Sequence, residues 1–312
     1  MELPEQLNIV FVCYNCGSDI RNVVEDIKTG DYPRDRVAIY VVDNDSTDDS
    51  VAILQNIADI NLTLIESPKN IGFGSGCNLA VSRIANSGPI LFLNPDVRLQ
   101  HNSLLKLVDF SRANPQSMIW GGVTCNASGQ LDGKNAWREP SLLGLLSWSL
   151  CIDALLKRAG HPGVDAYSQR QISSRGLVDA VSGCFLLIDR TLFSNLGGFD
   201  ERFFLYSEEI DLCRRARNLG ARPMVTDQAR VMHIGSKTLS SADKLNYLYH
   251  SKLLYFRKFW PGYKVKIARL TIATGALIRC CGFAFLSLLK RDFDRNRKLW
   301  WKFFKIQRQW DF

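Results

Sequence analysis

The sequence lacks the cysteine pattern of a secreted domain held together by disulfides. Its nine cysteines are an odd number scattered along 312 residues, which argues for a reducing compartment. Cys13 and Cys16 form a CxxC, but there is no second CxxC to complete a zinc site. We therefore expect one of these two thiols to belong to a strand and the other to a loop.

A signal-peptide pattern, internal repeats and low-complexity segments are also missing. The acidic opening MELPEQLNIV leads us to expect that the protein stays on the cytosolic side of the membrane. With 46% hydrophobic and 22% charged residues, the composition is that of an ordinary globular protein. The length allows one large domain with an appendage, or two modest domains.

Positive charge is scarce in most of the chain and concentrated near its end. Residues 244–312 contain sixteen Lys or Arg and three Asp, so the other 243 residues carry a net charge of −5 within the total of +8. A slightly acidic body with a basic tail indicates an anionic partner for the tail. We expect no nucleic acid there, because no recognised nucleic-acid-binding motif accompanies the basic residues.

The first hundred residues alternate between short apolar runs and segments with helical spacing. Predicted strands cover residues 8–15, 37–42, 62–65 and 90–93, with a helix after each of the first three. Ser18 is the predicted cap of the first helix. This order predicts an α/β fold with a doubly wound, mostly parallel sheet. Further along, the pattern predicts helices at 104–110 and 142–156, a strand at 183–189, a segment 203–219 that begins extended and becomes helical, and short strands at 223–225 and 230–232.

Polar residues lie at the carboxyl ends of three of the predicted strands, at Tyr14-Asn15, Asp43 and Asp96. Ligands of such sheets bind beyond the carboxyl ends of the strands, so we expect these side chains at one edge. The carboxylate of Asp43 can accept hydrogen bonds from a nucleobase or ribose, and that of Asp96 can bind a hard divalent cation. A helix cap at 43–48 and an ordinary turn at 94–96 are the alternatives that the local sequence leaves open.

A second acidic group lies among aromatic residues at 199–211 (FDERFFLYSEEID). Aromatic neighbours exclude water and can raise the pKa of a carboxylate toward that of a general base, whereas a favourable helix dipole is the simpler explanation. Asp211 is expected to pair with Arg215 at i, i+4, and to share a helix face with Glu208 but not with Glu209. His233, in an apolar stretch, is either structural or a metal ligand.

Taken in order, these motifs resemble those of the family 2 glycosyltransferases with the GT-A fold, especially bacterial rhamnosyltransferase-like enzymes that build surface polysaccharides. The resemblance covers residues 8–240. It is carried by VCYN at 12–15, VDNDSTD at 42–48, NIGFGSGCN at 70–78, LNPD at 93–96, GCFLLIDR at 183–190, residues 199–214 and His233. One such motif is weak, whereas seven in the same order are a specific signal.

The resemblance implies a role for each matching position. Glu209 corresponds to the catalytic base, with Glu208 beside it, and Asp96 and His233 correspond to ligands of Mg²⁺ or Mn²⁺. Asp43 would bind the nucleobase, residues 70–78 would line the donor, and residues 183–185 would shape the acceptor side. Substrate contacts are therefore expected at Tyr14, Asn15, Asp43, Asp45, Asn70, Gly72, Phe73, Gly76, Asn78, Asn94, Gly183 and Cys184.

Two positions depart from the family pattern. The acidic-x-acidic metal motif begins with Asn94, so only Asp96 supplies a carboxylate, and the usual Glu-Asp pair is Glu208-Glu209. The implied reaction is a single inverting displacement in which Glu209 takes a proton from the attacking acceptor hydroxyl. A nucleotide-diphosphate sugar is the implied donor, with dTDP-rhamnose first and UDP-hexoses next. A glycan or lipid-linked saccharide is the implied acceptor.

The resemblance also divides the chain into a nucleotide-sugar-binding half at 1–98, an acceptor-binding and catalytic half at 99–240 and a basic amphipathic helical tail at 241–312. Residues 268–289 nearly reach transmembrane length, but Arg279 near their middle costs roughly 2.5–3.5 kcal/mol in a bilayer. Flanking basic and aromatic residues suit a helix that lies on anionic lipid. We expect peripheral attachment to the inner face of the cell membrane, with a spanning helix or a helical cap on the catalytic body as alternatives.

Three rival interpretations have specific weaknesses. A dinucleotide-dependent oxidoreductase needs its glycine-rich loop after the first strand, and Cys77 stands where that motif needs glycine. A processive polysaccharide synthase needs several membrane spans and a Gln-x-x-Arg-Trp sequence, which residues 307–310 do not match. A catalytically inactive nucleotide-sugar-binding or scaffold protein stays open because of Asn94 and Glu209.

Overall fold

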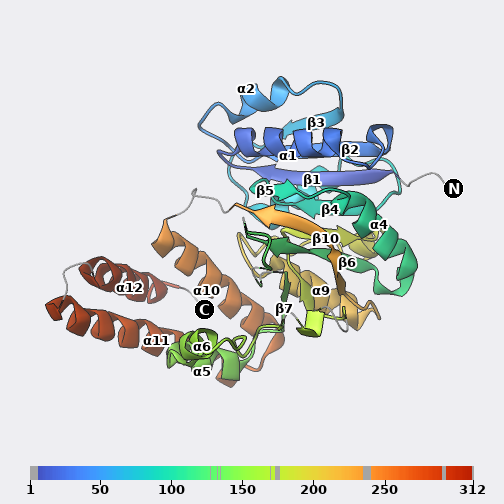
Figure 1. Cartoon of the computed structure of the whole chain (residues 1–312). Helices are drawn as coiled ribbons and strands as arrows, with labels where there is room; N and C mark the ends of the chain where they lie inside the picture. Colours follow the sequence, from blue (N-terminus) through green and yellow to red (C-terminus); the bar gives the residue numbers. More distant parts are fainter. Residues whose placement is uncertain are drawn as a thin grey trace. The chain divides into compact units, whose positions relative to one another are not determined.

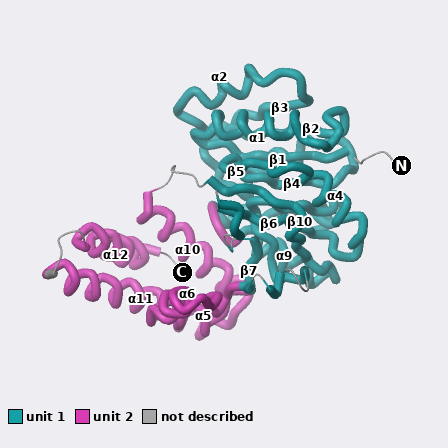
Figure 2. Tube along the Cα trace, in the orientation of Figure 1, with its two compact units in different colours: residues 1–138, 167–204, 208–238 teal, residues 139–166, 205–207, 239–312 magenta. Residues whose placement is uncertain are grey.

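The computed structural model describes residues 6–310 except 127, 132, 134, 169, 173–175, 235–239 and 290–292. The chain divides into two compact units (Figure 2). Unit 1 consists of residues 1–138, 167–204 and 208–238, and unit 2 of residues 139–166, 205–207 and 239–312. The segment 139–166, predicted to belong to the acceptor-binding half, is therefore part of the same unit as the tail.

Unit 1 is built on an eight-stranded sheet in the order β3-β2-β1-β4-β9-β6-β10-β5 (Figure 1). The strands are β1 (Leu7–Cys13), β2 (Val37–Asp43), β3 (Asn61–Glu66), β4 (Ile90–Leu93), β5 (Val97–Leu99), β6 (Ile119–Cys125), β9 (Phe185–Ile188) and β10 (Met224–His233). A separate short pair joins β7 (Ala136–Trp137) to β8 (Ala180–Val181). The predicted α/β sheet is confirmed, although β5 and β6 were not predicted from the sequence.

The sheet is parallel over its first four strands and mixed beyond them. β1 pairs in parallel with β2 and β4, and β2 pairs in parallel with β3. β9 runs antiparallel to both β4 and β6, while β10 is parallel to β6 and antiparallel to β5. The two short strands predicted at 223–225 and 230–232 are parts of β10, whose register shifts between Val225 and Arg230.

The strands of unit 1 are connected by helices that include α1 (Gly17–Thr29), α2 (Ser50–Gln55), α3 (Phe73–Val81), α4 (Ser103–Ala113), α8 (Arg190–Asn195) and α9 (Glu208–Asn218). Single 3₁₀ turns occur at Arg34–Arg36 and Pro115–Ser117. Helix α1 buries Ile20, Val23, Val24 and Ile27 against β1, as their i, i+3, i+4, i+7 spacing predicts. Its cap was predicted wrongly, because Ser18 lies inside the helix and Cys16 precedes it.

Unit 2 is helical, with α5 (Leu142–Ser149), α6 (Ile152–Arg158), α10 (Ser241–Phe259), α11 (Gly262–Leu289) and α12 (Phe293–Gln307). The single helix predicted at 142–156 is interrupted at Cys151, whose φ of 62° ends one helix and allows the next to start in a new direction. Among the described residues, one helical stretch, Gly262–Leu288 in α11, is long and apolar enough to cross a membrane, and 22% of its most apolar window is buried.

Candidate active site

The ends of strands far apart in the sequence meet at one edge of the unit 1 sheet. Strands β1, β2 and β4 are parallel, so Cys13, Asp43 and Leu93 end at the same edge. Because β9 is antiparallel to β4 and β6, and β10 is parallel to β6, His233 at the end of β10 reaches this edge as well. Gly183 and Cys184 precede β9 and so lie there too. The expected gathering of polar residues at one edge is what the topology produces.

Asp43, the last residue of β2, has one satisfied and one unsatisfied carboxylate oxygen. Its side chain is 4% exposed. Oδ2 accepts a hydrogen bond from the Ser46 backbone N–H at 3.1 Å, whereas buried Oδ1 has no partner within the described structure. An unsatisfied buried acceptor is costly, and a ligand N–H or O–H would relieve it. Asp43 is thus both a local cap and a candidate ligand contact.

The loop after β1 holds the loop after β2 in place. The backbone N–H of Asn15 donates to Ser46 Oγ at 2.9 Å, and Oδ1 of Asn15 accepts from the Thr47 N–H at 2.8 Å. Asn15 and exposed Asp45 both have positive φ, at 56° and 69°. Residues other than glycine rarely have a positive φ outside turns and functional sites. Tyr14 is half-buried directly after β1.

Asn44 organises the glycine-rich turn and was not singled out from the sequence. Its Nδ2 donates to Oδ1 of Asn70 at 3.0 Å and to the Gly72 carbonyl at 3.2 Å, and its Oδ1 accepts from the Ile71 N–H at 2.9 Å. Oδ1 of Asn70 also accepts from the Gly72 N–H at 3.0 Å. The only sequence signal for Asn44 was its position next to Asp43, since nothing in the sequence shows that Asn44 reaches residues 70–72.

The glycine-rich loop packs directly against the acidic start of α9. A Cβ on Gly74 would lie 3.7 Å from Cβ of Glu208, and one on Gly183 would lie 3.6 Å from the Phe73 ring and 3.8 Å from Cβ of Glu209. Further along helix α3, Gly76 lies against Val12 of β1, and a Cβ on Gly76 would lie 3.0 Å from the Val12 side chain. The predicted donor loop, Gly183 and the glutamate pair therefore meet.

The two glutamates differ in their surroundings. Glu208 is 5% exposed, its buried Oε2 has no hydrogen-bond partner, and Glu209 is only half-buried. Burial, followed by the negative charge of Glu209, raises the pKa of Glu208 well above its usual range. The buried carboxyl is therefore protonated at pH values where an exposed glutamate is ionised. Tyr206 and Ser207, just before the pair, have φ of 71° and 67°, which is strained for these residue types.

Asp96 and His233 face each other at the end of the sheet. Oδ2 of buried Asp96 lies 3.4 Å from Nε2 of His233, and the Ile234 N–H donates to the Asp96 carbonyl at 2.9 Å. Burial, and then the charge of Asp96, raises the pKa of Asp19 in the first turn of α1. The described residues hold no cluster of three or more His, Cys, Asp or Glu, so these two side chains could supply only part of a metal's ligands.

The remaining predicted residues make mainly backbone contacts. Asn94 is half-buried, and its N–H donates to the carbonyl of buried Cys184 at 3.0 Å, which joins the β4 end to the residues before β9. The Asn78 side chain bonds the backbone of Phe199. The predicted pair of Asp211 with Arg215 is confirmed at 2.7 Å.

Curated proteins of known activity resemble this chain at low identity. An N-acetylglucosaminyl-diphospho-decaprenol L-rhamnosyltransferase of Mycobacterium tuberculosis is 26% identical, over 74% of this chain and 76% of that protein. The rhamnosyltransferase WbbL of Escherichia coli is 27% identical, over 69% of this chain and 78% of WbbL. These relatives support an enzyme and give no support to the inactive alternative.

Solved structures show the same fold. The mannosyltransferase PcManGT from Pyrobaculum calidifontis, in complex with GDP-Man and Mn²⁺, has a TM-score of 0.59 at 16% identity and covers 97% of this chain and 87% of its own. GalNAc-T7 with UDP, GalNAc and Mn²⁺ has a TM-score of 0.61 at 15% identity, over 85% of this chain and 50% of its own. A model of glycosyl transferase family 2 matches residues 8–197, well over half of the chain. The protein therefore belongs to glycosyl transferase family 2 and is a glycosyltransferase.

Proposed function

We propose that the chain transfers rhamnose from dTDP-rhamnose, with inversion, to a hydroxyl group of a lipid-linked saccharide in the synthesis of a surface polysaccharide. The observation that carries the proposal is the packing of the glycine-rich loop and Gly183 against the Glu208-Glu209 pair. This packing brings a candidate donor surface within one side-chain length of a candidate base. The choice of rhamnose rests on the rhamnosyltransferases among the relatives. The choice of a lipid-linked acceptor rests on the decaprenol-linked substrate in the name of one of them.

On the donor side, the chain offers a buried acceptor for the nucleotide. Oδ1 of Asp43 has no partner in the described structure, so a nucleobase N–H would satisfy it. The Asn15–Thr47 and Asn44–Asn70 hydrogen bonds fix the loops on both sides of that atom. Preorganised loops reduce the entropy lost when the donor binds.

At the reacting carbon, Glu209 is the proposed general base. It is half-buried beside Gly183, with its Oε2 atom buried, and it is the more exposed of the two glutamates, since Glu208 is buried as a whole. The Glu209 carboxylate would remove the proton of the acceptor hydroxyl as that oxygen attacks the anomeric carbon. The raised pKa of buried Glu208 favours its neutral form, which avoids placing a second negative charge next to the base.

For the metal, Asp96 and His233 are the proposed ligands. One carboxylate and one imidazole on the same edge suit Mn²⁺, and two of the solved structures with this fold carry that ion. When bound, such a cation offsets the negative charge of the donor diphosphate.

Asp96→Ala should abolish the Mn²⁺ dependence of dTDP binding, measured by isothermal titration with and without Mn²⁺. Asp109→Ala, at an exposed residue of α4, is the control. Equal Mn²⁺ dependence in Asp96→Ala would place the metal elsewhere.

Unit 2 is the proposed contact with the membrane. Among the described residues, exposed large apolar side chains concentrate there, in α5, α6 and α11, together with the basic residues of the tail. An apolar surface flanked by positive charge binds anionic lipid. Peripheral attachment to the cytoplasmic face would bring the enzyme to a lipid-linked acceptor.

The test is a reaction of the full-length protein with Mn²⁺, dTDP-rhamnose and N-acetylglucosaminyl-diphospho-polyprenol. We expect a rhamnosylated lipid, identified by mass spectrometry, and the release of dTDP. UDP-GlcNAc and GDP-mannose in parallel reactions test the choice of donor. Transfer from another donor alone would replace rhamnose in the proposal, and the absence of product from any donor and acceptor would refute it.

A further inference from the structure

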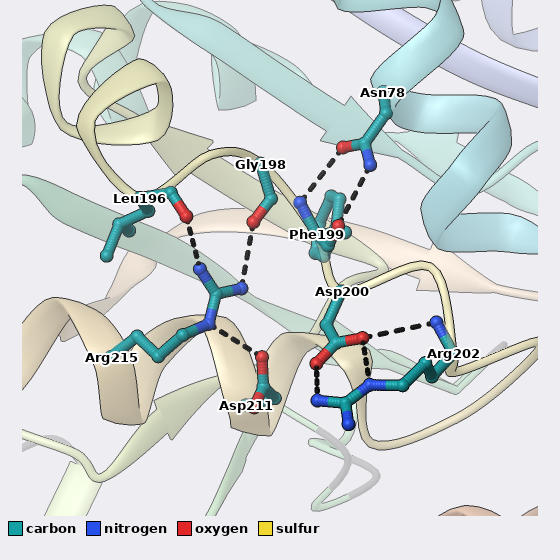
Figure 3. A network of polar contacts seen from close by, with 8 residues as sticks. All are labelled: Asn78, Leu196, Gly198, Phe199, Asp200, Arg202, Asp211 and Arg215. Atoms are coloured by element: carbon teal, nitrogen blue, oxygen red, sulfur yellow. Dashed lines mark hydrogen bonds and ion pairs between the residues drawn. The ribbon is translucent and has the colours of Figure 1, made fainter.

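The Asn78 side chain clamps the backbone of a residue 121 positions further along the chain (Figure 3). Its Nδ2 donates to the Phe199 carbonyl at 2.9 Å, and its Oδ1 accepts from the Phe199 N–H at 2.9 Å. A second contact of Nδ2, to Oε1 of Glu201, is 3.4 Å long. Both hydrogens of the amide are therefore used, and its oxygen is already bonded.

Glycine at position 198 is needed for this clamp. Gly198 has a φ of +77°, and a Cβ there would collide with the Asn78 amide. Phe199 itself is fully packed, with ring centroids 5.0 Å from Phe92 and 5.5 Å from Phe193. The clamped residue is thus a fixed point of the core rather than a mobile loop position.

The same segment is fastened to the catalytic helix from its other side. Nη1 of Arg215 donates to the Leu196 carbonyl and Nη2 donates to the Gly198 carbonyl, each at 2.8 Å, while Nε donates to Asp211 at 2.7 Å (Figure 3). Arg215 and Asp211 belong to α9, whose first residues are Glu208 and Glu209. Asp211 is fully buried, so this ion pair is shielded from solvent.

A second link joins the glycine-rich loop to the residues before α9. The Phe73 N–H donates to the Phe204 carbonyl at 2.9 Å. Gly72, with a φ of +83°, lies so close to that carbonyl that a Cβ would collide with it. Helix α3, which the glycine-rich loop begins, is therefore tied to residues 196–204 at both its start and its middle.

We propose that Asn78 is a positioning residue that sets the distance between the donor loop and Glu209 through Phe199, Gly198 and Arg215. This role takes the place of the direct donor contact expected from the sequence, and it rests on the proposed function. A misplacement of about 1 Å between reacting groups can cost on the order of 10²-fold in rate. The role predicts a loss of turnover without a matching loss of donor affinity.

The test compares Asn78→Ala with Ser82→Ala in the full-length protein. Ser82 follows the same helix and is exposed, and its hydroxyl donates to the Leu79 carbonyl of its own turn; its backbone N–H, which the substitution keeps, donates to the Asn78 carbonyl. We expect Asn78→Ala to lower kcat for dTDP release from dTDP-rhamnose about 10-fold to 100-fold, with the Kd for dTDP and Mn²⁺ changed less than twofold. Ser82→Ala should match the wild type in both.

A second variant tests the connection to α9. Arg215→Lys keeps a positive charge near Asp211 but cannot bond both the Leu196 and the Gly198 carbonyls. If both residues act through the same segment, the double variant should lose less kcat than the product of the two single losses. Fully multiplicative losses would overturn the proposed connection.

Hydrogen exchange separates this inference from the proposed function. In the ligand-free protein, Asn78→Ala should speed exchange of the Phe199 amide at least tenfold, because its acceptor is gone. Unchanged exchange, unchanged kcat, or a dTDP affinity that falls in step with kcat would each overturn the positioning role. Faster exchange in a protein whose wild type transfers no sugar would refute the proposed function and leave the clamp standing.

Discussion

At the scale of single residues, Glu209 and Glu208 are neighbours in one helical turn with different exposure. Glu209 is half-buried beside Gly183, whereas Glu208 is buried behind the glycine-rich loop. A general base must reach the proton that it removes, and Glu209, although its Oε2 is buried, is the more exposed of the two. The burial of Glu208 raises its pKa and so favours its neutral form, which fits a supporting position better than that of a second base.

We expect Glu209→Gln to reduce turnover about 10²-fold to 10⁴-fold, because an amide cannot accept the proton of the acceptor hydroxyl. The Kd for dTDP with Mn²⁺ should stay unchanged, since the substitution preserves size. Rates of dTDP release and titration calorimetry measure the two quantities. Glu25→Gln, at an exposed residue of α1 paired with Lys28, is the matched control. Full activity of Glu209→Gln would place the base elsewhere.

The raised pKa of Glu208 predicts a pH dependence of stability. The pKa of this carboxyl group is higher in the folded protein than in the unfolded chain, where it is about 4.3. Between these two pKa values the unfolded chain releases the proton and the folded protein keeps it. The free energy of unfolding therefore falls as the pH rises through this window. Glu208→Gln removes this cost. The Tm difference between the variant and the wild type should therefore grow as the pH rises from 5 to 8.

Differential scanning calorimetry at the two pH values measures this difference. Glu66→Gln, at the exposed end of edge strand β3, should show none. Comparing pH values within each variant cancels any fixed cost of burying the glutamine amide. A Tm difference independent of pH would mean that Glu208 is ionised in the folded protein.

Short-range pairs could be predicted from the sequence, and long-range hydrogen bonds could not. Asp211 and Arg215 are one helical turn apart, so the spacing alone predicted their pair. Asn44 and Asn78 reach partners that the chain brings together only through the sheet topology, and neither contact leaves a local pattern. Asn78 stood in a recognisable motif, yet its bond to Phe199 depends on residues 121 positions away.

At the scale of elements, strands with continuous apolar runs were predictable, whereas those in irregular surroundings were not. β1, β2 and β4 follow the predicted runs within two residues at each end. β6 contains two adjacent glycines, Gly121 and Gly122, which obscure its apolar pattern, although a Cβ at either position would collide with Val181 or Phe185. β5 has only three residues, too few for any period to show.

The apolar composition of helix α11 suits a membrane span, whereas its local packing suits a helix held within unit 2. The guanidinium of Arg279 donates to the carbonyls of Trp148, Ser149 and Gly275, and lies 4.3 Å from the Trp148 ring and 5.1 Å from the Trp300 ring. Two of those carbonyls end α5, where a positive charge is favourable. Gly275 allows the approach, since a Cβ there would touch Trp148. The charge that a bilayer would penalise therefore holds the helices of unit 2 together.

We expect Arg279→Leu to lower the stability of unit 2 by about 2–4 kcal/mol, because it removes three charged hydrogen bonds and two cation–π contacts. The same substitution would favour a membrane-spanning helix by roughly 2.5–3.5 kcal/mol. Thermal unfolding of the purified protein gives the sign of the stability change, with Lys266→Leu, at an exposed residue of the same helix, as the control. A more stable, membrane-extracted Arg279→Leu protein would favour the spanning alternative.

At the scale of the whole molecule, charge and exposed apolar surface gather in one unit. Most of the exposed large apolar side chains among the described residues lie in unit 2, in α5, α6, α11 and α12. The same unit holds the basic residues of the tail. Such a surface is unfavourable in water unless something covers it. Its basic residues favour an anionic covering, such as a bilayer that contains anionic lipid.

We therefore predict that the full-length protein binds vesicles containing anionic phospholipid through α11. Leu270, Phe285 and Leu288 are 69%, 67% and 82% exposed, and each would contribute up to about 1.5–3 kcal/mol on full burial in lipid. Replacing all three with serine should lower the bound fraction in liposome flotation at least tenfold without changing the Tm. Leu219→Ser, at a residue 60% exposed in unit 1, should float like the wild type.

Binding should also weaken as salt screens the basic residues, and neutral vesicles should bind less. Undiminished flotation of the triple variant would mean that another surface meets the membrane, and no flotation of the wild type would mean that the exposed face of α11 is covered by protein.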